Sequence, residues 1–472
     1  MSNTIDKTQE LATKPIGQLL LIYALPAVLS QVIASVYNIC DRIFLGQFVG
    51  AMAISGLAIT MPIMNIVHAF GSLVGAGASA RMSIVLGHKD ERWAEKILGN
   101  SMLLTFFFGF LFVGGGYLFM DRILTAFGAS TETIAYAREY MVIVLPGMFF
   151  TTVTFNLAGL IRASGYPNKS MVVLVIGAVL NIILDAVFIC WLGWGIAGAA
   201  WATTVSMAVS SCFAVMHFVS PKSFIRFKRH AWTPKFYIFR NILAIGISPF
   251  SMNVAASLVV ALLNKQLIRY GGDIAVGAYG VCNTFGSFLV LFMLGLCQGM
   301  QPIAGYNYGA GHTHRLGAVY RLSLAVNVLC GIVGSVLALT VPRLMLRMFT
   351  GDEQLIQIGI PAMRFLTVMF PLIGYTITNS QFFQSIDKPW IAIVTSLSRQ
   401  VLFLIPAMYL VPSLFVRLGG DGLTGVWCSC TICDVLGAVL AFVLFLTQRR
   451  IFHPDNVLPE RRPRSEALEE ES

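Results

Sequence analysis

The chain has 472 residues, of which 57% are hydrophobic and 11% are charged, and it carries a formal net charge of +10. Soluble domains are about one quarter charged, so this composition excludes an ordinary soluble domain. The repeated apolar runs are about 20 residues long and indicate a polytopic helical membrane protein. The basic residues lie in the connections between these runs, which indicates orientation in a membrane and not binding of nucleic acid.

Twelve membrane-spanning helices are predicted along the chain. Their approximate limits are 16–43, 51–79, 97–119, 133–161, 170–191, 197–219, 239–270, 274–302, 317–341, 355–384, 390–415 and 422–447. Several exceed the usual length, and such spans tilt or bend in the bilayer. Pro26 and Pro249 interrupt the first and the seventh span, which is tolerated where neighbouring groups satisfy the freed backbone. The expected fold class is therefore an all-α polytopic membrane protein.

The connections divide the basic residues unequally between the two sides of the membrane, with 22 Lys and Arg on one side and 5 on the other. Cytoplasmic loops carry the excess of positive charge, so the richer side, with both termini, is predicted to be cytoplasmic. We expect a multi-pass protein of a cell membrane, the inner membrane of a bacterium. The predicted organisation is a cytoplasmic N-terminus (1–15), an N-terminal lobe (16–220), a basic cytoplasmic linker (221–238), a C-terminal lobe (239–448) and a charged cytoplasmic tail (449–472).

The two halves of the chain repeat. The matching pairs are Pro26 with Pro249 at an offset of 223 and, at an offset of 222, Gly77 with Gly299, Gly87 with Gly309, Phe127 with Phe349, and Pro167 with Pro389. Six spans in each half give both halves the same orientation, as in transporters built from parallel repeats about an axis along the membrane normal. We therefore expect two six-helix bundles related by a pseudo-twofold axis, with a central cleft between them.

Two acidic residues lie inside apolar runs of the N-terminal half. Asp185 follows Asn181 by four residues in the fifth span, so both share one helix face. Asp41 lies near the outer end of the first span, one turn after Tyr37. A charged group at mid-membrane costs about 2.5–3.5 kcal/mol on insertion scales, so such residues are functional-site candidates by default.

The direction of each span allows these groups to meet in the outer half of the N-terminal bundle, with Tyr140 of the fourth span and Thr203 of the sixth. Carboxylate, amide and hydroxyl oxygens are hard ligands for a small cation such as Na⁺, and a carboxylate pair could equally hold a proton. The predicted ion-coupling residues are Asp41, Asp185, Asn181, Thr203, Tyr37 and Tyr140. The alternative is a structural link between helices, with Asp41 paired to Arg42 or exposed at the outer mouth.

Two further charges, Arg399 and Asp434, lie at similar depth in spans eleven and twelve, and we expect them to form a structural charge pair. The cysteines at 428–433 have no His or acid that would complete a tetrahedral site on their helix. No metal is therefore predicted, apart from possible Na⁺ at Asp41 and Asp185. No catalytic or nucleotide-binding motif appears, so neither an enzyme nor a cofactor is expected.

The chain from about 15 to 450 resembles the MATE (multidrug and toxic compound extrusion) family, in particular its MepA-like and DinF-like branches. The motifs that carry the resemblance are Leu25-Pro26 with Asp41 in the first span, the stretch 75–83, GHKD at 87–90, IRASGYP at 161–167, and Asn181 with Asp185. The resemblance implies a V-shaped pair of six-helix lobes that exports organic cations in exchange for H⁺ or Na⁺. It also implies that the family's cation site in the N-terminal lobe corresponds here to Asp41, Asn181, Asp185 and Thr203, with Tyr37 and Tyr140 nearby.

The C-terminal half departs from the NorM-type members of that family, which carry acids in spans seven and ten. Asn264, followed by Lys265, stands at the position equivalent to Asp41, and span ten offers Gln381 and Gln384 instead of acids. We therefore expect ion coupling in the N-terminal lobe.

Drugs that are cationic and amphipathic are the expected small-molecule partners. Twenty Met and 34 Phe supply adaptable apolar surface and aromatic faces that attract lipophilic cations. Apart from the lipid bilayer, no obligate partner is evident. The polar residues expected to line the substrate cleft are Gln31, Ser35, Asn156, Asn253, Asn283, Gln301, Gln381 and Gln384.

The predicted function is a secondary active multidrug efflux antiporter, coupled to H⁺ or Na⁺ through the N-lobe carboxylate pair. One alternative is a lipid-linked-precursor flippase of the same superfamily, which would favour a strongly basic central cavity. Another is a channel, which would show downhill flux without countertransport. A third is an intramembrane enzyme, which would need a catalytic constellation that the sequence does not offer.

Overall fold

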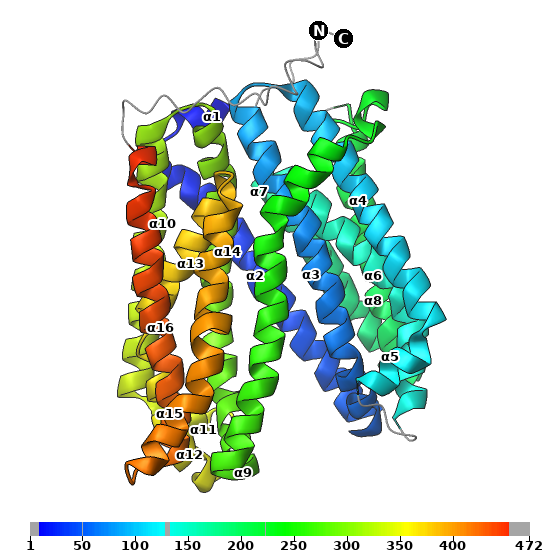
Figure 1. The fold of residues 1–472 in the computed structure, drawn as a ribbon. Helices are drawn as coiled ribbons and strands as arrows, with labels where there is room; N and C mark the ends of the chain where they lie inside the picture. The colour runs from blue at the N-terminus through cyan, green and yellow to red at the C-terminus, as the bar shows by residue number, and fades with distance from the viewer. Residues whose placement is uncertain (1–8, 50, 128–132, 222, 453–472) are drawn as a thin grey trace.

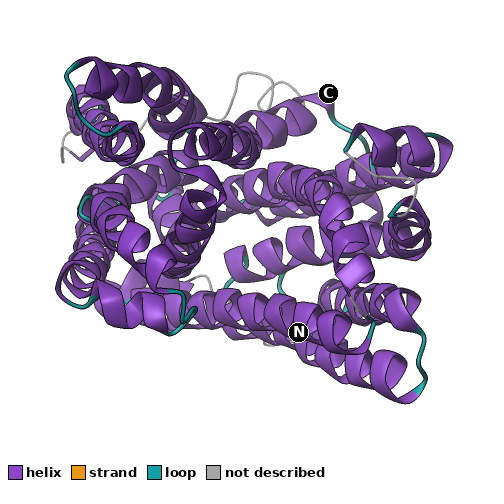
Figure 2. Cartoon of the chain, turned by 90° about the horizontal axis from the view of Figure 1, so that it is seen from below, coloured by secondary structure: helices purple, strands orange, loops and turns teal. Residues whose placement is uncertain are grey.

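The computed structural model describes residues 9–49, 51–127, 133–221 and 223–452, and all regular structure in these ranges is helical (Figures 1 and 2). Residues 1–8 of the predicted N-terminal segment and 453–472 of the predicted tail lie outside the described ranges. The domain boundaries expected from the sequence stay predictions.

The N-terminal half contains eight α-helices and one π-helical segment within the described ranges. They are α1 (Gln9–Thr13), α2 (Ile16–Phe48), α3 (Ala51–Gly87), α4 (Glu91–Leu118), α5 (Met120–Ala126), α6 (Ile134–Ala163), α7 (Pro167–Asp185), the π-helix η1 (Ala186–Trp191) and α8 (Gly195–Val219). A short 3-10 helix, η2 (Arg229–Trp232), follows in the connection to the second half. Asp90 caps the start of α4 by accepting from the backbone N–H of Trp93 at 3.0 Å.

The C-terminal half begins with the longest helix. Its elements are α9 (Phe236–Gly309), α10 (Thr313–Thr340), α11 (Pro342–Arg347), α12 (Glu353–Thr367), α13 (Phe370–Ser385), α14 (Pro389–Leu397), the π-helix η3 (Ser398–Leu404), α15 (Ile405–Arg417), α16 (Gly422–Thr447) and the 3-10 helix η4 (Arg449–Phe452). Asp421 caps α16 by accepting from the backbone N–H groups of Leu423 and Thr424, both at 3.1 Å.

The predicted number of membrane spans agrees with these helices. Ten described helical segments are long and apolar enough to cross a membrane, and α12 with α13 forms an eleventh span with a 44° bend. The 74-residue α9 holds two spans, because Gly272 at its middle has a φ of 67° and interrupts the helical backbone. The sum is twelve, and the protein is an all-α polytopic membrane protein.

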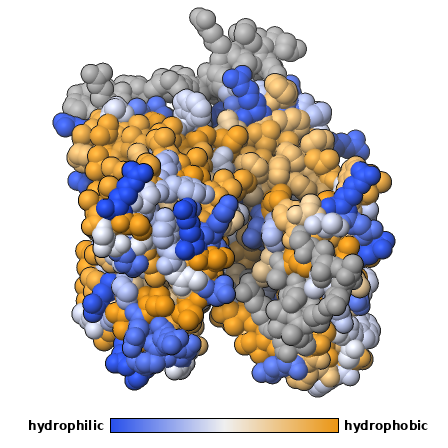
Figure 3. Space-filling model, turned by 60° about the horizontal axis from the view of Figure 1, so that its bottom comes forward, coloured by the Kyte–Doolittle hydropathy of each residue, from blue (hydrophilic) through white to orange (hydrophobic). Residues whose placement is uncertain are grey.

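The helices form two bundles that separate toward the lower end in Figure 1. Helices α3 to α8 (light blue to teal) make up one bundle, and α10 to α16 (yellow-green to red) make up the other. The first helix of each half, α2 and α9, runs obliquely between the bundles. Figure 3 looks into the lower end and shows a hollow between the two bundles, which is the central cleft.

The backbone repeats at the same offset as the sequence. Lys89 and Gly311 have φ values of 60° and 73°, and both follow the second span of their half. Gly165 and Asp387 have φ values of 94° and 58°, and both follow the fourth. Each pair is 222 residues apart, so the two halves use the same left-handed turns on the side predicted to be cytoplasmic.

On that side the bundles close against each other through glycines. A Cβ atom at Gly246 of α9 would lie 1.7 Å from the backbone oxygen of Leu73 in α3. A Cβ atom at Gly299 would lie 2.4 Å from the Cα atom of Ala24 in α2. Because Ala24 and Gly246 are also 222 residues apart, this close approach of backbones occurs twice, once on each side of the pseudo-twofold axis.

Candidate functional site

A group of six polar side chains lies inside the N-terminal bundle, and we call it the N-lobe chamber. Its members are Tyr37 and Asp41 of α2, Tyr140 of α6, Asn181 and Asp185 of α7, and Thr203 of α8. The structure brings all six together from four helices, as the direction of the spans predicted. Asp185 ends α7, 18 residues after its first residue, which places the chamber roughly 27 Å along that helix and in the predicted outer half of the membrane.

Hydrogen bonds and charge link the members of the chamber. The Asn181 amide donates to Thr203 Oγ1 at 3.3 Å, and Thr203 also shares a hydrogen bond with Tyr140. The charges of Asp41 and Asp185 lie close enough to interact electrostatically. Asp185 is 0% exposed, Asn181 and Tyr140 are 1% exposed, and Asp41 is half-buried. The alternative pairing of Asp41 with Arg42 falls outside the described side chains.

Asp185 is the member with the least protein compensation. Both of its carboxylate oxygens are buried, and neither accepts a hydrogen bond from the described part of the chain. The same holds for the amide oxygen of Asn181. A buried carboxylate without donors is expensive to keep charged in an apolar medium. The donor set of carboxylate, amide and hydroxyl oxygens therefore fits either a small hard cation or a bound proton.

Local helix geometry supports this arrangement. The α-helical pattern ends at Asp185, and the next six residues form the π-helix η1. Such segments are rare and occur often at functional sites, because the wider turn changes the direction of neighbouring side chains. Asn181 and Asp185 remain on one face of α7, as their spacing predicts.

A small cavity of about 30 Å³ adjoins the chamber and is lined by Tyr37 and Thr203 together with His68, Met148 and Thr151. This volume holds one water molecule or one small ion and is too small for a drug. His68 of α3 was not among the predicted residues, although an ionisable side chain within an apolar run is itself a signal. Its ring stacks edge-on against Phe155 at 5.5 Å.

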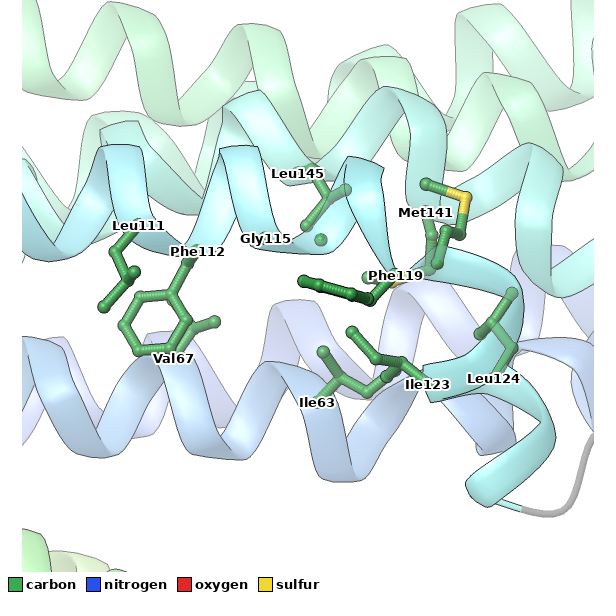
Figure 4. Close-up of a pocket in the computed structure, with 12 residues that line it drawn as sticks. Ile63, Val67, Leu111, Phe112, Gly115, Phe119, Ile123, Leu124, Met141 and Leu145 are labelled. Carbon is green, nitrogen blue, oxygen red and sulfur yellow. The ribbon is translucent and has the colours of Figure 1, made fainter.

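A second cavity in the same bundle, of about 250 Å³, has a different character (Figure 4). It lies among α3, α4, α5 and α6, and its lining residues are all apolar or glycine, for example Ile63, Phe112, Phe119 and Leu145. Val67 lines both this cavity and the small one. Because it offers no polar side chain, this space cannot hold an ion.

The C-terminal bundle contains the largest mixed cavity of those we describe in detail, about 440 Å³, which we call the C-lobe cavity. Arg399 of η3 and Asp434 of α16 lie on its wall and form a salt bridge, so the structure places the predicted charge pair together. Asn283, a predicted cleft residue, also lines this cavity.

The other predicted cleft residues have mixed settings. Asn156 is a correction: it is fully buried, and its amide donates to Ser101 Oγ at 3.2 Å and Thr105 Oγ1 at 3.0 Å, so it fastens α6 to α4. Gln301 and Gln384 are also buried, and Gln301 donates across the bundles to the backbone oxygen of Ala76 at 3.3 Å. The remaining predicted residues are partly or fully exposed: Gln31, Ser35, Asn253 and Gln381.

Polar contacts that the sequence did not predict join the two bundles on the closed side. Arg81 of α3 pairs with Asp387 of the α13–α14 turn at 3.4 Å. Arg162, at the end of α6, donates to Gln298 Oε1 of α9 at 3.2 Å. These contacts and the glycine contacts described above hold one end of the cleft shut.

The connection between the halves is attached to the N-terminal bundle. Lys228 and His230 approach the carboxylate of Glu95 at 2.9 and 3.0 Å, and the Glu95 side chain is 3% exposed. The Asn100 side chain accepts from the backbone N–H of Lys235 at 2.8 Å. The basic segment predicted as a linker is thus packed against α4.

Comparison with known proteins reproduces both the fold and the repeat. The family model MatE matches twice, at residues 26–187 and 249–410. The starts of the two matches are 223 residues apart, so the predicted repeat is confirmed. Together the matches cover more than half of the chain.

The relatives cover almost the whole chain. The multidrug export protein MepA of Staphylococcus aureus (strain MRSA252) is 25% identical over 438 residues, which are 93% of this chain and 95% of that protein. The MepA protein of Staphylococcus haemolyticus (strain JCSC1435) is 26% identical over 430 residues, 91% and 93% of the two chains.

Solved structures share the fold. A MOP superfamily transporter from Pyrococcus furiosus superposes with a TM-score of 0.87 at 23% identity, covering 94% of this chain and 98% of that one. An outward-facing multidrug resistance MATE family transporter gives the same TM-score and identity over 95% and 99% of the two chains. The resemblance seen in the sequence is confirmed, and the chain belongs to the MatE family of membrane transporters, which are not enzymes.

Proposed function

We propose that this protein is a secondary active antiporter that exports amphipathic organic cations in exchange for H⁺ or Na⁺. The relatives named multidrug export proteins support the export of drugs. The observation that carries the coupling is the position of Asp185, whose two buried oxygens lack donors while its charge faces that of Asp41. One cation or proton shared by this pair would remove the electrostatic conflict.

The coupling step takes place in the N-lobe chamber. Asp41 and Asp185 hold the ion, Asn181 and Thr203 orient the site through their hydrogen bond, and Tyr37 and Tyr140 close its walls. The adjoining cavity of about 30 Å³ has room for an ion and not for a drug. Ion and drug therefore occupy different places and compete by favouring different conformations of the transporter, since only differential affinity shifts such an equilibrium.

The drug binds in a region of the cleft between the bundles. The exposed or half-buried polar residues Gln31 and Ser35 of α2, Asn253 of α9 and Gln381 of α13 contribute to it. The cleft opens at the end opposite to the closed glycine contacts, and charge places that open end outside the cell. This orientation puts both termini in the cytoplasm and the protein in the inner membrane of a bacterium.

Transport in proteoliposomes tests the proposal. An outward-directed flux of an ethidium-like cation is expected under an imposed H⁺ or Na⁺ gradient, with each gradient applied separately. Asp185→Asn should abolish the dependence on the gradient. Asp273→Asn is the matched control, because Asp273 is an exposed carboxylate at the outer connection within α9. Gradient-driven export at the parent rate by Asp185→Asn would refute the coupling role.

A further inference from the structure

The C-lobe cavity has the size and the lining of a binding site. Its volume of about 440 Å³ lies within the range of roughly 300–1,000 Å³ for pockets that hold small organic molecules. Most of the lining is apolar, including Leu263, Phe370 and Leu404, and a few polar groups converge on it. A largely apolar pocket with a few placed polar groups is typical of sites for amphipathic ligands.

An ion pair lies in the wall of this cavity. Asp434 follows the first residue of α16 by 12 residues, so it lies roughly 18 Å along that helix, near mid-membrane. The side chain of Asp434 is 6% exposed, and that of Arg399 is 27% exposed. The guanidinium is therefore the charged group that the cavity presents, with the carboxylate behind it.

The guanidinium of Arg399 has donors to spare. It carries five N–H groups in a planar fork, and among the described residues it donates to Asp434 alone. Buried ion pairs add little to stability compared with apolar packing, whereas ionisable groups in a membrane mark functional sites. The structural role expected from the sequence does not use these remaining donors.

Two local features place Arg399 at the cavity. It lies with Gln400 in the π-helix η3, and both side chains line the space. Gly437 of α16 makes room for it, since a Cβ atom there would lie 3.1 Å from the Cβ and Cγ atoms of Arg399. The amide oxygen of Gln400 is buried and accepts no hydrogen bond from the described residues, so the wall offers an acceptor beside the guanidinium.

We propose that the C-lobe cavity binds amphipathic organic molecules that bear a carboxylate, with Arg399 holding the carboxylate. A carboxylate matches the planar guanidinium fork in a two-point contact. Gln400 accepts from a donor on the ligand, and the apolar walls take its body. Cations are disfavoured, because Arg399 already occupies Asp434. This binding extends the substrate range beyond the cations of the proposed function.

Equilibrium binding to the whole protein in nanodiscs tests this proposal, with empty nanodiscs subtracted. The probes are pyrenebutyrate and its uncharged amide, which differ only at the carboxyl group. The parent protein should bind pyrenebutyrate saturably and at least tenfold more tightly than the amide. Equal affinity for the two probes, or tighter binding of ethidium that depends on Arg399, would overturn the proposal.

Variants show where the probe binds. The double variant Arg399→Gln with Asp434→Asn leaves neither charge unpaired and should lose the preference for the carboxylate. Arg343→Gln with Glu353→Gln neutralises an exposed ion pair outside the cavity and should keep it. If the first double variant does not fold, Asn283→Trp fills the cavity from α9 and should abolish saturable binding. A preference retained in these cavity variants would place the site elsewhere and overturn the proposal.

A membrane fatty acid and an aromatic acid share this chemistry. Displacement of the probe by decanoate would assign the site to fatty acids, and its persistence would assign the site to aromatic carboxylates; either result supports the carboxylate class. The measurement uses no ion gradient, so it does not depend on the coupling proposed for the N-terminal lobe.

Discussion

The two bundles carry opposite solutions to the same problem at related places in the repeat. In each bundle the fifth span contains a π-helical segment, η1 after Asp185 in the first and η3 around Arg399 in the second. The N-lobe chamber keeps two carboxylates together without a basic partner in the printed contacts of Asp185. The C-lobe cavity keeps one carboxylate tied to an arginine.

The size of each space follows the same division. The cavity beside the N-lobe chamber is about 30 Å³ and the C-lobe cavity is about 440 Å³. A small space with acidic oxygens suits an ion, and a large space with a neutralised acid suits an organic molecule. The comparison teaches that a repeated scaffold can divide ion handling and ligand binding between its copies.

The largest expected effect comes from removing the acid of the chamber. Asp185→Asn keeps the volume and removes the charge, so ion-coupled export should fall by more than about tenfold, which corresponds to roughly 1.4 kcal/mol of lost coupling free energy. Asp434→Asn removes the acid of the other bundle and should leave the dependence on the ion gradient intact. Initial rates in proteoliposomes measure both, and equal losses in the two variants would erase the proposed division.

Breaking the C-lobe ion pair on one side is expected to affect stability more than coupling. Arg399→Leu leaves Asp434 buried without its partner, which should destabilise the protein by about 3–5 kcal/mol. Replacing both residues by neutral ones should restore most of that loss. Thermal unfolding in detergent measures the difference. If Arg399→Leu alone were as stable as the parent, the pair would not be a buried one.

The closed side of the cleft should respond to a single methyl group. Gly246→Ala places a Cβ atom against the Leu73 backbone oxygen, and overpacking of this kind costs about 1–3 kcal/mol. We expect a shift toward conformations with that side open, seen as faster labelling of an engineered cysteine there. Gly280→Ala in the same helix has nothing within 4 Å and serves as the control. Identical labelling in the two variants would argue against the close approach.

The smallest expected effect concerns the ion pair between the bundles. Arg81→Gln removes the contact with Asp387, whose side chain is 41% exposed, so the loss should be about 0–1 kcal/mol. The effect should shrink as salt rises, because exposed charges are screened. Unfolding midpoints at low and high salt measure it, and a large loss that salt does not change would assign Arg81 a different role.

The sequence predicted the spans well because the bilayer sets their length. The last span was expected at 422–447, and α16 is Gly422–Thr447. The convergence of Asp41 and Asp185 also followed from topology, since the direction of each span fixes the depth of its residues. Their role in coupling is our proposal.

The faces of the helices were harder to predict. Lipid is as apolar as a packed bundle, so hydrophobic periodicity does not separate a face toward lipid from one toward another helix. Asn156 was therefore assigned to the cleft although it bonds to α4 inside the bundle. The contacts of Arg81 and Arg162 between bundles needed the relative placement of distant segments, which no local pattern encodes.

Release of the coupling ion tests the central claim most directly. An ethidium-like cation is added to the purified protein in weakly buffered solution, and released protons or displaced radioactive Na⁺ are counted. We predict about one ion per bound drug for the parent and for Asp273→Asn, and none for Asp185→Asn. Release of the same size from Asp185→Asn would contradict the claim that this carboxylate and Asp41 hold the exchanged ion.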